Sequence, residues 1–265
     1  APGQGNIPSN AKVHSYPLYE KYGLIWIWMG NTALADHQDI FEIEYYDNPS
    51  WGINRGDAME LECNYLLMCD NLLDPSHVAW VHAGSFGQAA TKSAPLRVKK
   101  TNDGIIVHRW MLDVEPAPFY KKVVGFDGNC DRLQHYEVRY PSNALIKAVF
   151  TPAGTGGSEG KLHDDVFIMD SYNFMTPVTE SKTRYYWFQL RNIRPDDSAL
   201  SQLMTDDVQQ AFEEDRNVLN EVQKGMTNKT SPHIDLPIDA GQLRFRRQLQ
   251  AMINEEEQVD KQMAQ

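Results

Sequence analysis

The sequence predicts an α+β fold in which an antiparallel sheet packs against long helices near the C-terminus. Six segments rich in β-branched and aromatic residues follow one another, separated by turn residues such as those at 102–104. The stretch Asp197–Lys224 then has apolar residues at helical spacing. Hydrophobic residues make up 42% and charged residues 23% of the 265 positions, which is ordinary globular composition and excludes a disordered chain.

The first part of the chain predicts two strands, a helix and a loop. Lys12–Tyr16 and Gly23–Met29 are the strand candidates, and the second is aromatic, β-branched and bounded by glycines. Asn71–His82 is expected to be helical, because Asp74–Pro75 offers an N-cap followed by proline at the first helical position. Ala83–Ala94 is rich in Gly, Ala and Ser and predicts a loop.

The rest of the chain predicts a meander of strands and then two helices. The six strand candidates are Leu96–Lys99, Ile105–Leu112, Leu133–Tyr140, Ala144–Thr151, Val166–Met175 and Thr183–Leu190. The helix Asp197–Lys224 follows a Pro–Asp pair and ends at Gly225. A second, polar helix is expected over Gln242–Gln265.

Charge and cysteine usage exclude several classes of protein. With 36 acidic against 25 basic residues, the net charge of −11 provides no basic surface for nucleic acid and disfavours an anionic membrane. The longest compact apolar run, Leu24–Met29, is too short to span a bilayer. Three cysteines without a C-x-x-C motif fit a reduced, cytoplasmic compartment. Because the chain starts at Ala1 without a methionine, we expect it to be part of a longer protein.

Two histidines form the first candidate site. On a helix, Asn71, Asp74 and His77 would share one face, because they are three residues apart. His82 would lie about 140° round the helix from His77, so the two imidazoles could meet at one ion only if the helix ended between them. The alternative is that Asp74 caps a helix and both histidines are ordinary, partly buried residues.

A carboxylate within an apolar stripe forms the second candidate. Asp215 occupies the vacant position of the stripe formed by Met204, Val208, Phe212, Leu219 and Val222. An unpaired buried carboxylate costs several kcal/mol unless it binds a cation or a metal. Two histidines and a carboxylate make the facial triad that holds Fe(II) with open coordination positions. A zinc hydrolase, or a buried ion pair with Arg or Lys, remains an alternative.

Two sequence segments resemble the catalytic domain of Rieske non-heme iron oxygenases. Residues 63–82, CNYLLMCDNLLDPSHVAWVH, match the signature N-x2-D-x2-H-x4-H of that family at all four positions, and are most similar to the vanillate O-demethylase and dicamba monooxygenase group. Residues 212–223, FEEDRNVLNEVQ, resemble the helix with the third iron ligand. The resemblance implies a helix-grip (START-like) sheet and an Fe(2+) site formed by His77, His82 and Asp215.

The resemblance also implies what this chain lacks. A Rieske [2Fe–2S] cluster needs C-x-H and C-x2-C-x-H motifs, and neither occurs in the sequence. The N-terminal Rieske domain is therefore absent from this chain, and its cluster is expected in a part not present here. Residues 1–30 would be the strands that follow that domain, and residues 31–265 the mononuclear iron catalytic domain.

The implied activity is O2-dependent monooxygenation, most simply O-demethylation, of a small aromatic substrate. Electrons would reach the iron from a Rieske centre, and a reductase or ferredoxin would reduce that centre. Asp74 is placed to hydrogen-bond the His77 imidazole, and the family's matching aspartate transfers electrons between subunits of a homotrimer. Asn71 would be polar support near the iron or a turn residue, and Ile146 and Asn173 would line the substrate pocket. The alternatives are a ring-hydroxylating dioxygenase and, in another class, an apolar-ligand binding module without metal chemistry.

Overall fold

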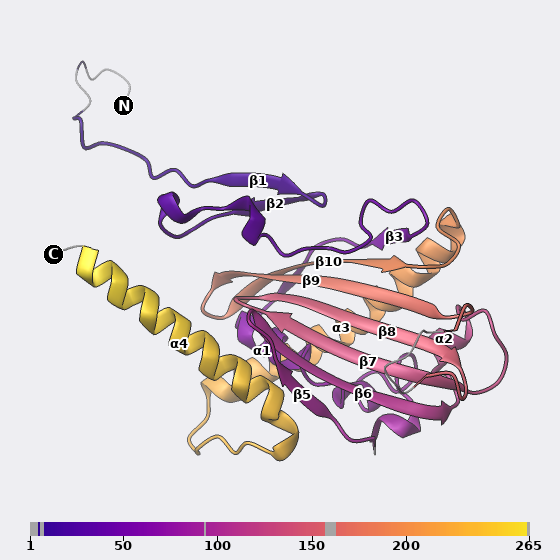
Figure 1. The fold of residues 1–265 in the computed structure, drawn as a ribbon. Coiled ribbons are helices and arrows are strands. Elements are labelled where there is room, and N and C mark those ends of the chain that lie inside the picture. The colour runs from indigo at the N-terminus through magenta and orange to yellow at the C-terminus, as the bar shows by residue number, and fades with distance from the viewer. Residues whose placement is uncertain (1–4, 6–7, 93, 157–162, 264–265) are drawn as a thin grey trace. The chain divides into compact units, whose positions relative to one another are not determined.

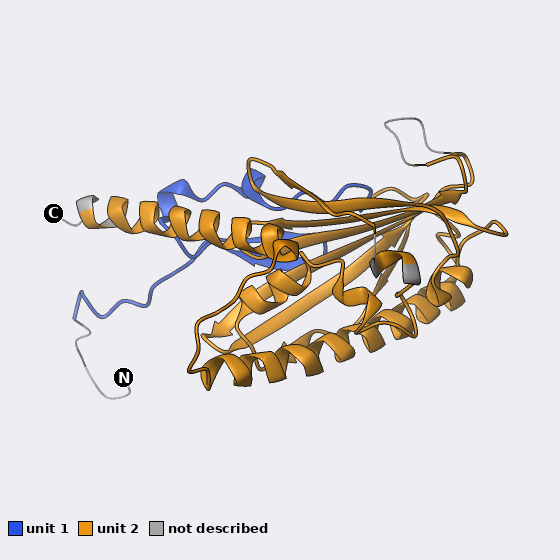
Figure 2. Cartoon of the chain, turned by 90° about the horizontal axis from the view of Figure 1, so that it is seen from below, with its two compact units in different colours: residues 1–46 blue, residues 47–265 orange. Residues whose placement is uncertain are grey.

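The computed structural model describes residue 5 and residues 8–92, 94–156 and 163–263. The chain divides into two compact units, residues 1–46 and 47–265 (Figure 2). The expected division at residue 30 falls inside the first unit, because the 3₁₀ helices η1 (Thr32–Leu34) and η2 (His37–Asp39) follow its hairpin. The roles expected for the two parts of the chain stay predictions.

The first unit contains a short hairpin of β1 (Leu18–Lys21) and β2 (Leu24–Ile27). The turn residues Tyr22 and Gly23 both have positive φ angles, 61° and 70°, as a two-residue type I′ turn requires. This turn fixes the register, so the strand paired with β2 is the four residues directly before Tyr22. The strand expected at Lys12–Tyr16 is therefore wrong, and those residues lie outside the ladder.

The second unit is built on an antiparallel sheet in the order β3-β10-β9-β8-β7-β6-β5, with β4 also paired to β10 (Figure 1). All six expected sheet strands are present as neighbours in a meander. The strands are β3 (Gly52–Arg55), β4 (Met59–Leu61), β5 (Arg97–Lys100), β6 (Gly104–Val114), β7 (Cys130–Arg139), β8 (Asn143–Pro152), β9 (Phe167–Thr179) and β10 (Lys182–Arg191). The short strands β3 and β4 were not expected, because they carry few β-branched residues.

Two long helices complete this unit, and the predicted α+β architecture is confirmed. The helix α3 (Ser198–Thr227) begins after Asp197, whose carboxylate accepts a hydrogen bond from Leu200 N. It runs across one face of the sheet (Figure 2). The helix α4 (Ala240–Met263) follows the 3₁₀ helix η5 (Pro237–Asp239) and buries Phe245, which stacks on the Tyr140 ring. Among the described helices, none combines the length and the apolar character needed to cross a bilayer.

The continuous helix expected over Asn71–His82 is wrong, because the α-helix of this region lies earlier and ends at Asn71. Helix α1 (Tyr65–Asn71) starts after Asn64, whose side chain accepts from Leu66 N, and it ends three residues before Asp74. The residue before a proline disfavours helical backbone, which stops α1 ahead of Pro75. Only a short 3₁₀ helix, η3 (His77–Ala79), follows. Of the other short elements, η4 spans Ala89–Lys92 and α2 spans Pro118–Lys121.

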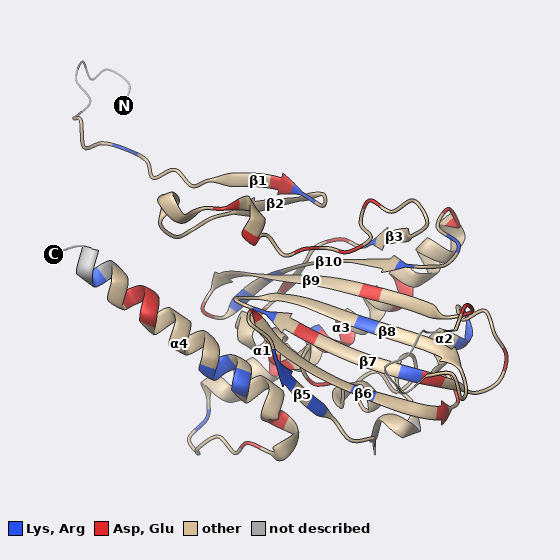
Figure 3. Cartoon of the chain, viewed as in Figure 1, with Lys and Arg blue, Asp and Glu red and all other residues tan. Residues whose placement is uncertain are grey.

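The two faces of the sheet differ in character. Acidic and basic positions lie side by side along β7, β8 and β9 (Figure 3). Lys147 Nζ lies 3.2 Å from Asp170 Oδ2, and Glu137 contacts both Arg139 (2.5 Å) and His135 (3.1 Å). The residues that alternate with Glu137 on β7 point to the opposite face, which α3 covers. That helix-covered face holds the site described next.

Candidate metal centre

The two histidines lie on the irregular segment between α1 and the sheet. His77 begins η3, which ends at Ala79, so His82 lies in the turn beyond it. Helical structure thus ends between the two histidines, which is the condition for both imidazoles to approach one ion. The carbonyl of His82 accepts backbone hydrogen bonds from Phe86 and Gly87, which hold this turn in place. The ring centroids of the two imidazoles are 5.1 Å apart.

Each imidazole is anchored through Nδ1, which leaves Nε2 free to bind. His77 Nδ1 lies 2.5 Å from the backbone carbonyl oxygen of Asp74, and His82 Nδ1 lies 2.7 Å from Glu214 Oε2. Donation of the Nδ1 proton to these oxygens fixes the tautomer in which Nε2 carries a lone pair. The predicted bond from Asp74 to His77 therefore uses the carbonyl and not the carboxylate. The carboxylate of Asp74 instead accepts from Ser76 N at 2.8 Å.

Asp215 reaches the same point from α3. It is 2% exposed and lies among the buried residues of that helix, as the apolar stripe predicted; these are Leu200, Met204, Val208, Ala211 and Leu219. Its Oδ1 is 3.2 Å from His82 Nε2 and 3.6 Å from His77 Nε2. One ligand atom from each of the three residues lies within 4.8 Å of the others. The structure thus brings together the three predicted metal ligands.

Asn71 supports this cluster from the last turn of α1. Its Nδ2 donates to Asp215 Oδ1 at 3.0 Å, while its Oδ1 is buried without a hydrogen-bond partner. A buried carbonyl oxygen without a partner is costly unless an ion or a donor approaches it. The contact with Asp215 is the one that a polar-support role would use, and the role of Asn71 stays a prediction.

The electrostatics of the cluster favour a cation. Burial alone lowers the pKa of His82, but Asp215 and Glu214 outweigh burial and raise it. Among the described residues, no Lys or Arg pairs with Asp215, and the neighbouring Arg216 pairs with Glu213 instead. The buried ion pair considered from the sequence is thus not formed. Two imidazoles and one carboxylate are a donor set that suits Fe(II), so the residues fit an iron ion.

A cavity of about 80 Å³ opens beside the three candidate ligands. Its walls come from the helix-covered face of the sheet, from α3 and from residues 72–92, the segment that carries His77 and His82 and is called the histidine segment below. The walls are mainly apolar and include Val78, Phe86, Tyr120, Ile146, Met169, Val208 and Phe212. Ile146 therefore lines this cavity, and its contact with a substrate stays a prediction. On β9 the cavity is lined by Ser171 and not by Asn173, which is fully buried and accepts a hydrogen bond from the Tyr185 hydroxyl.

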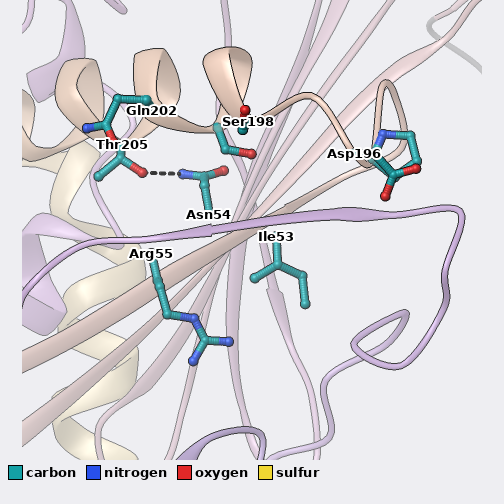
Figure 4. Close-up of a pocket in the computed structure, with 9 residues that line it drawn as sticks. Ile53, Asn54, Arg55, Asp196, Ser198, Gln202 and Thr205 are labelled. Atoms are coloured by element: carbon teal, nitrogen blue, oxygen red, sulfur yellow. Dashed lines mark hydrogen bonds between the residues drawn. The ribbon is translucent and has the colours of Figure 1, made fainter.

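A larger hollow of about 400 Å³ lies between β3 and the start of α3 (Figure 4). Its lining is polar, and Asn54 Nδ2 contacts Thr205 Oγ1 across it at 3.5 Å. The same amide donates to Gln189, a residue of the smaller cavity, at 2.8 Å. None of the three candidate metal ligands lines the larger hollow, so size alone would select the wrong site.

Sequence reasoning missed Glu214. The helical angle places it on the flank of the apolar stripe, and this position alone gives it no part in the site. It points sideways, but His82 approaches α3 from that flank and Nδ1 meets its carboxylate. A signal was available, because a histidine ligand usually donates its second ring N–H to a carboxylate or carbonyl.

Comparison with known proteins identifies the family. The vanillate O-demethylase oxygenase C-terminal domain family matches residues 61–255. The chain is 33% identical over 244 residues to the toluene-4-sulfonate monooxygenase system iron-sulfur subunit of Comamonas testosteroni, covering 91% of this chain and 70% of that protein. It is 31% identical over 257 residues to a vanillate O-demethylase oxygenase subunit of a Pseudomonas species, covering 95% and 78%.

Solved structures show the same fold. A crystal structure of dicamba monooxygenase bound to 3,6 dichlorosalicylic acid aligns with a TM-score of 0.83 at 24% identity, over 97% of this chain and 74% of that one. The site geometry, the family match over three quarters of the sequence and the relatives above 30% identity agree with one another. The chain belongs to the vanillate O-demethylase oxygenase C-terminal domain family, the catalytic domains of the oxygenase components of Rieske non-heme iron enzymes.

Proposed function

We propose that His77 Nε2, His82 Nε2 and an oxygen of Asp215 hold one Fe(II) ion that activates O2 beside the apolar cavity. The observation that carries the proposal is the convergence of these three atoms at the wall of that cavity. Three protein ligands leave coordination positions open, and iron bound there would supply the redox chemistry of oxygen insertion. The chain's own residues exclude water, orient the imidazoles and hold the substrate.

The substrate we propose is a small aromatic compound, and the reaction is monooxygenation of a methyl carbon, so that an O-methyl group leaves as formaldehyde. The names of the relatives support this choice, because they include vanillate and dicamba O-demethylases and a toluene-4-sulfonate monooxygenase. Phe86, Tyr120 and Phe212 supply ring surfaces that suit an aromatic ligand. Ring dihydroxylation and ligand binding without a metal have no comparable support.

The electrons are proposed to come from a Rieske [2Fe–2S] cluster, which a reductase or ferredoxin reduces. Asp74 is half-buried on the histidine segment, and its carbonyl contacts His77 directly, which supports a role in electron transfer to the iron. In a homotrimer, as the family resemblance implies, the cluster would come from a neighbouring subunit. The three cysteines are buried and unpaired, which supports a reducing, cytoplasmic setting.

The first test is metal content. We expect about one iron per chain after anaerobic incubation with Fe(II), since the described residues form one such triad. Asp215→Ala and His77→Ala should lose that iron and remain folded, whereas Asp206→Ala, an exposed carboxylate on the same helix, should retain it. Unchanged iron in Asp215→Ala would refute the ligand assignment, and stoichiometric zinc would favour hydrolytic chemistry.

The second test concerns the reaction and Asp74. The oxygenase supplied with electrons and an aryl methyl ether should release formaldehyde, and formation of a cis-diol would exclude demethylation. Asp74→Asn should lower turnover and leave iron content unchanged, because the carbonyl that contacts His77 is retained. Loss of iron in that variant would indicate that Asp74 serves only to build the metal site.

A further inference from the structure

A buried arginine lines the cavity next to the candidate metal ligands. Arg132 lies on β7, four residues before Tyr136 on the same face of the strand, and both residues contribute to the cavity wall. It is only 2% exposed. A guanidinium is always protonated in proteins, so this residue places a permanent positive charge within a mainly apolar cavity.

Within the described part of the chain, the contacts of Arg132 are to neutral groups. Its Nη1 donates to Gln88 Oε1 at 2.5 Å and to the Phe86 carbonyl at 3.3 Å. The guanidinium carbon lies 4.9 Å and 5.1 Å from the ring centroids of Tyr120 and Phe150. Its Nε is buried and has no hydrogen-bond partner.

No carboxylate of the described residues forms an ion pair with this guanidinium. The adjacent Asp131 points to the other face of β7, where its carboxylate accepts from the backbone nitrogens of Asp113, Gly154 and Gly156. Buried arginines are normally paired with an acid, because an uncompensated charge in the interior is strongly unfavourable. Arg109 and Arg191 are also buried and donate to neutral groups, but only Arg132 of the three lines the cavity beside the candidate metal ligands, where a ligand can supply the counter-ion.

We propose that Arg132 is the specificity-determining residue of the cavity: its guanidinium binds the anionic group, carboxylate or sulfonate, of an aromatic substrate and so discriminates against uncharged aromatics. The inference rests on the proposed function, since it concerns the same cavity. Arginine suits this role because its planar donors match the oxygens of a carboxylate or sulfonate. Gln88 and the two aromatic rings hold the guanidinium in place for that contact.

The chemistry of the other cavity walls suits such a ligand. The walls also include Ile146, Met169 and Phe86, which suit an uncharged ring. Ser171 Oγ is buried there without a partner and can bond a polar ring substituent. An aromatic acid would thus present its anionic end to Arg132 and its opposite side to the metal site.

The experiment compares two probes that differ in charge and little in shape. Calorimetric titration of the protein, with and without Fe(II), should show tighter binding of para-methoxybenzoate than of para-methoxybenzamide. Arg132→Gln should weaken benzoate binding about 10- to 100-fold, the range for a hydrogen bond to a charged group. The same variant should leave the affinity for the benzamide nearly unchanged, and Arg132→Lys should restore part of the benzoate affinity. Para-methoxybenzenesulfonate, titrated in parallel, tells which anion is preferred.

The controls separate anion binding from damage to the fold. Arg109→Gln removes a buried arginine of the neighbouring strand that does not line the cavity, and it should preserve the benzoate preference. An equal loss for both probes in Arg132→Gln, or an unchanged benzoate preference, would overturn the inference. The preference is read from binding, so it can hold even if the protein retains no iron, which would refute only the proposed function. Conversely, normal iron content without the preference would refute only the role of Arg132.

Discussion

Replacing Glu214 by glutamine tests whether the second nitrogen of His82 controls the metal site. The carboxylate lies 2.7 Å from His82 Nδ1, and the side chain is one-third exposed, so glutamine fits without a steric clash. Glutamine is neutral and weakens the charge-assisted hydrogen bond that makes the imidazole a better ligand. The three proposed ligands themselves remain in place.

The expected effect is a loss of iron affinity with little loss of stability. Removal of such an outer partner typically lowers metal affinity about 10- to 100-fold, which corresponds to about 1.4–2.8 kcal/mol. Because water reaches part of Glu214, we expect a value in the lower half of that range. The pKa of His82 should fall in the same variant, since Glu214 is one of the groups that raise it.

Affinity is measured by anaerobic competition with a chromogenic Fe(II) chelator, and thermal unfolding of the metal-free protein serves as the stability check. Glu213→Gln is the matched control, because this neighbouring acid pairs with Arg216 and not with a histidine. Equal iron affinity in the Glu214→Gln variant and the native protein would show that the His82 contact does not tune the site. Equal losses of iron affinity in both variants would show that the effect comes from the net charge of α3 and not from the His82 contact.

Three further predictions concern the support of the site and the fold. Asn71→Ala should lower iron affinity about tenfold in the same competition assay, because Asp215 loses its amide donor; unchanged affinity would leave Asn71 as a turn residue. Phe245→Ala should cost about 3–5 kcal/mol in urea unfolding, because the ring is fully buried; a cost below about 1 kcal/mol would contradict docking of α4 through this residue. Burial raises the pKa of Glu137, but its bonds to His135 and Arg139 outweigh burial and lower it. The contribution of the Glu137 carboxylate to the free energy of unfolding is therefore present above the ordinary glutamate pKa of 4.5, and it is lost as pH falls through the lowered pKa. The difference in unfolding free energy between the native protein and Glu137→Gln should be about 1 kcal/mol at neutral pH and should shrink in acid, and a constant difference would refute the assignment.

The sheet and the long helices could be predicted because their local signals agree with their tertiary environment. Aromatic and β-branched runs such as Thr183–Leu190 form central strands, where both propensity and burial favour the same structure. The short segments were less predictable. β3 and β4 owe their place to pairing with β10. Helix α1 ends at Asn71, four residues before Pro75. Those outcomes depend on neighbours distant in sequence.

The candidate ligands could be predicted because each breaks a local rule. Asp215 is a charge in an apolar stripe, and the spacing of His77 and His82 makes sense only if the helix ends between them. The contacts around them could not be predicted with the same accuracy. Whether a histidine is held by the carboxylate or by the carbonyl of Asp74 depends on a turn that Pro75 sets, and the Glu214 contact depends on the angle at which the turn meets α3.

The chain positions of the ligands have a mechanical consequence. His82 and Glu214 are 132 positions apart, and the histidine segment between α1 and β5 has little regular structure of its own. An ion bound at this point would cross-link that segment to α3 and make it as slow to open as the helix itself. Chelation should then increase amide hydrogen exchange across residues 72–92 while β7 to β10 keep their protection.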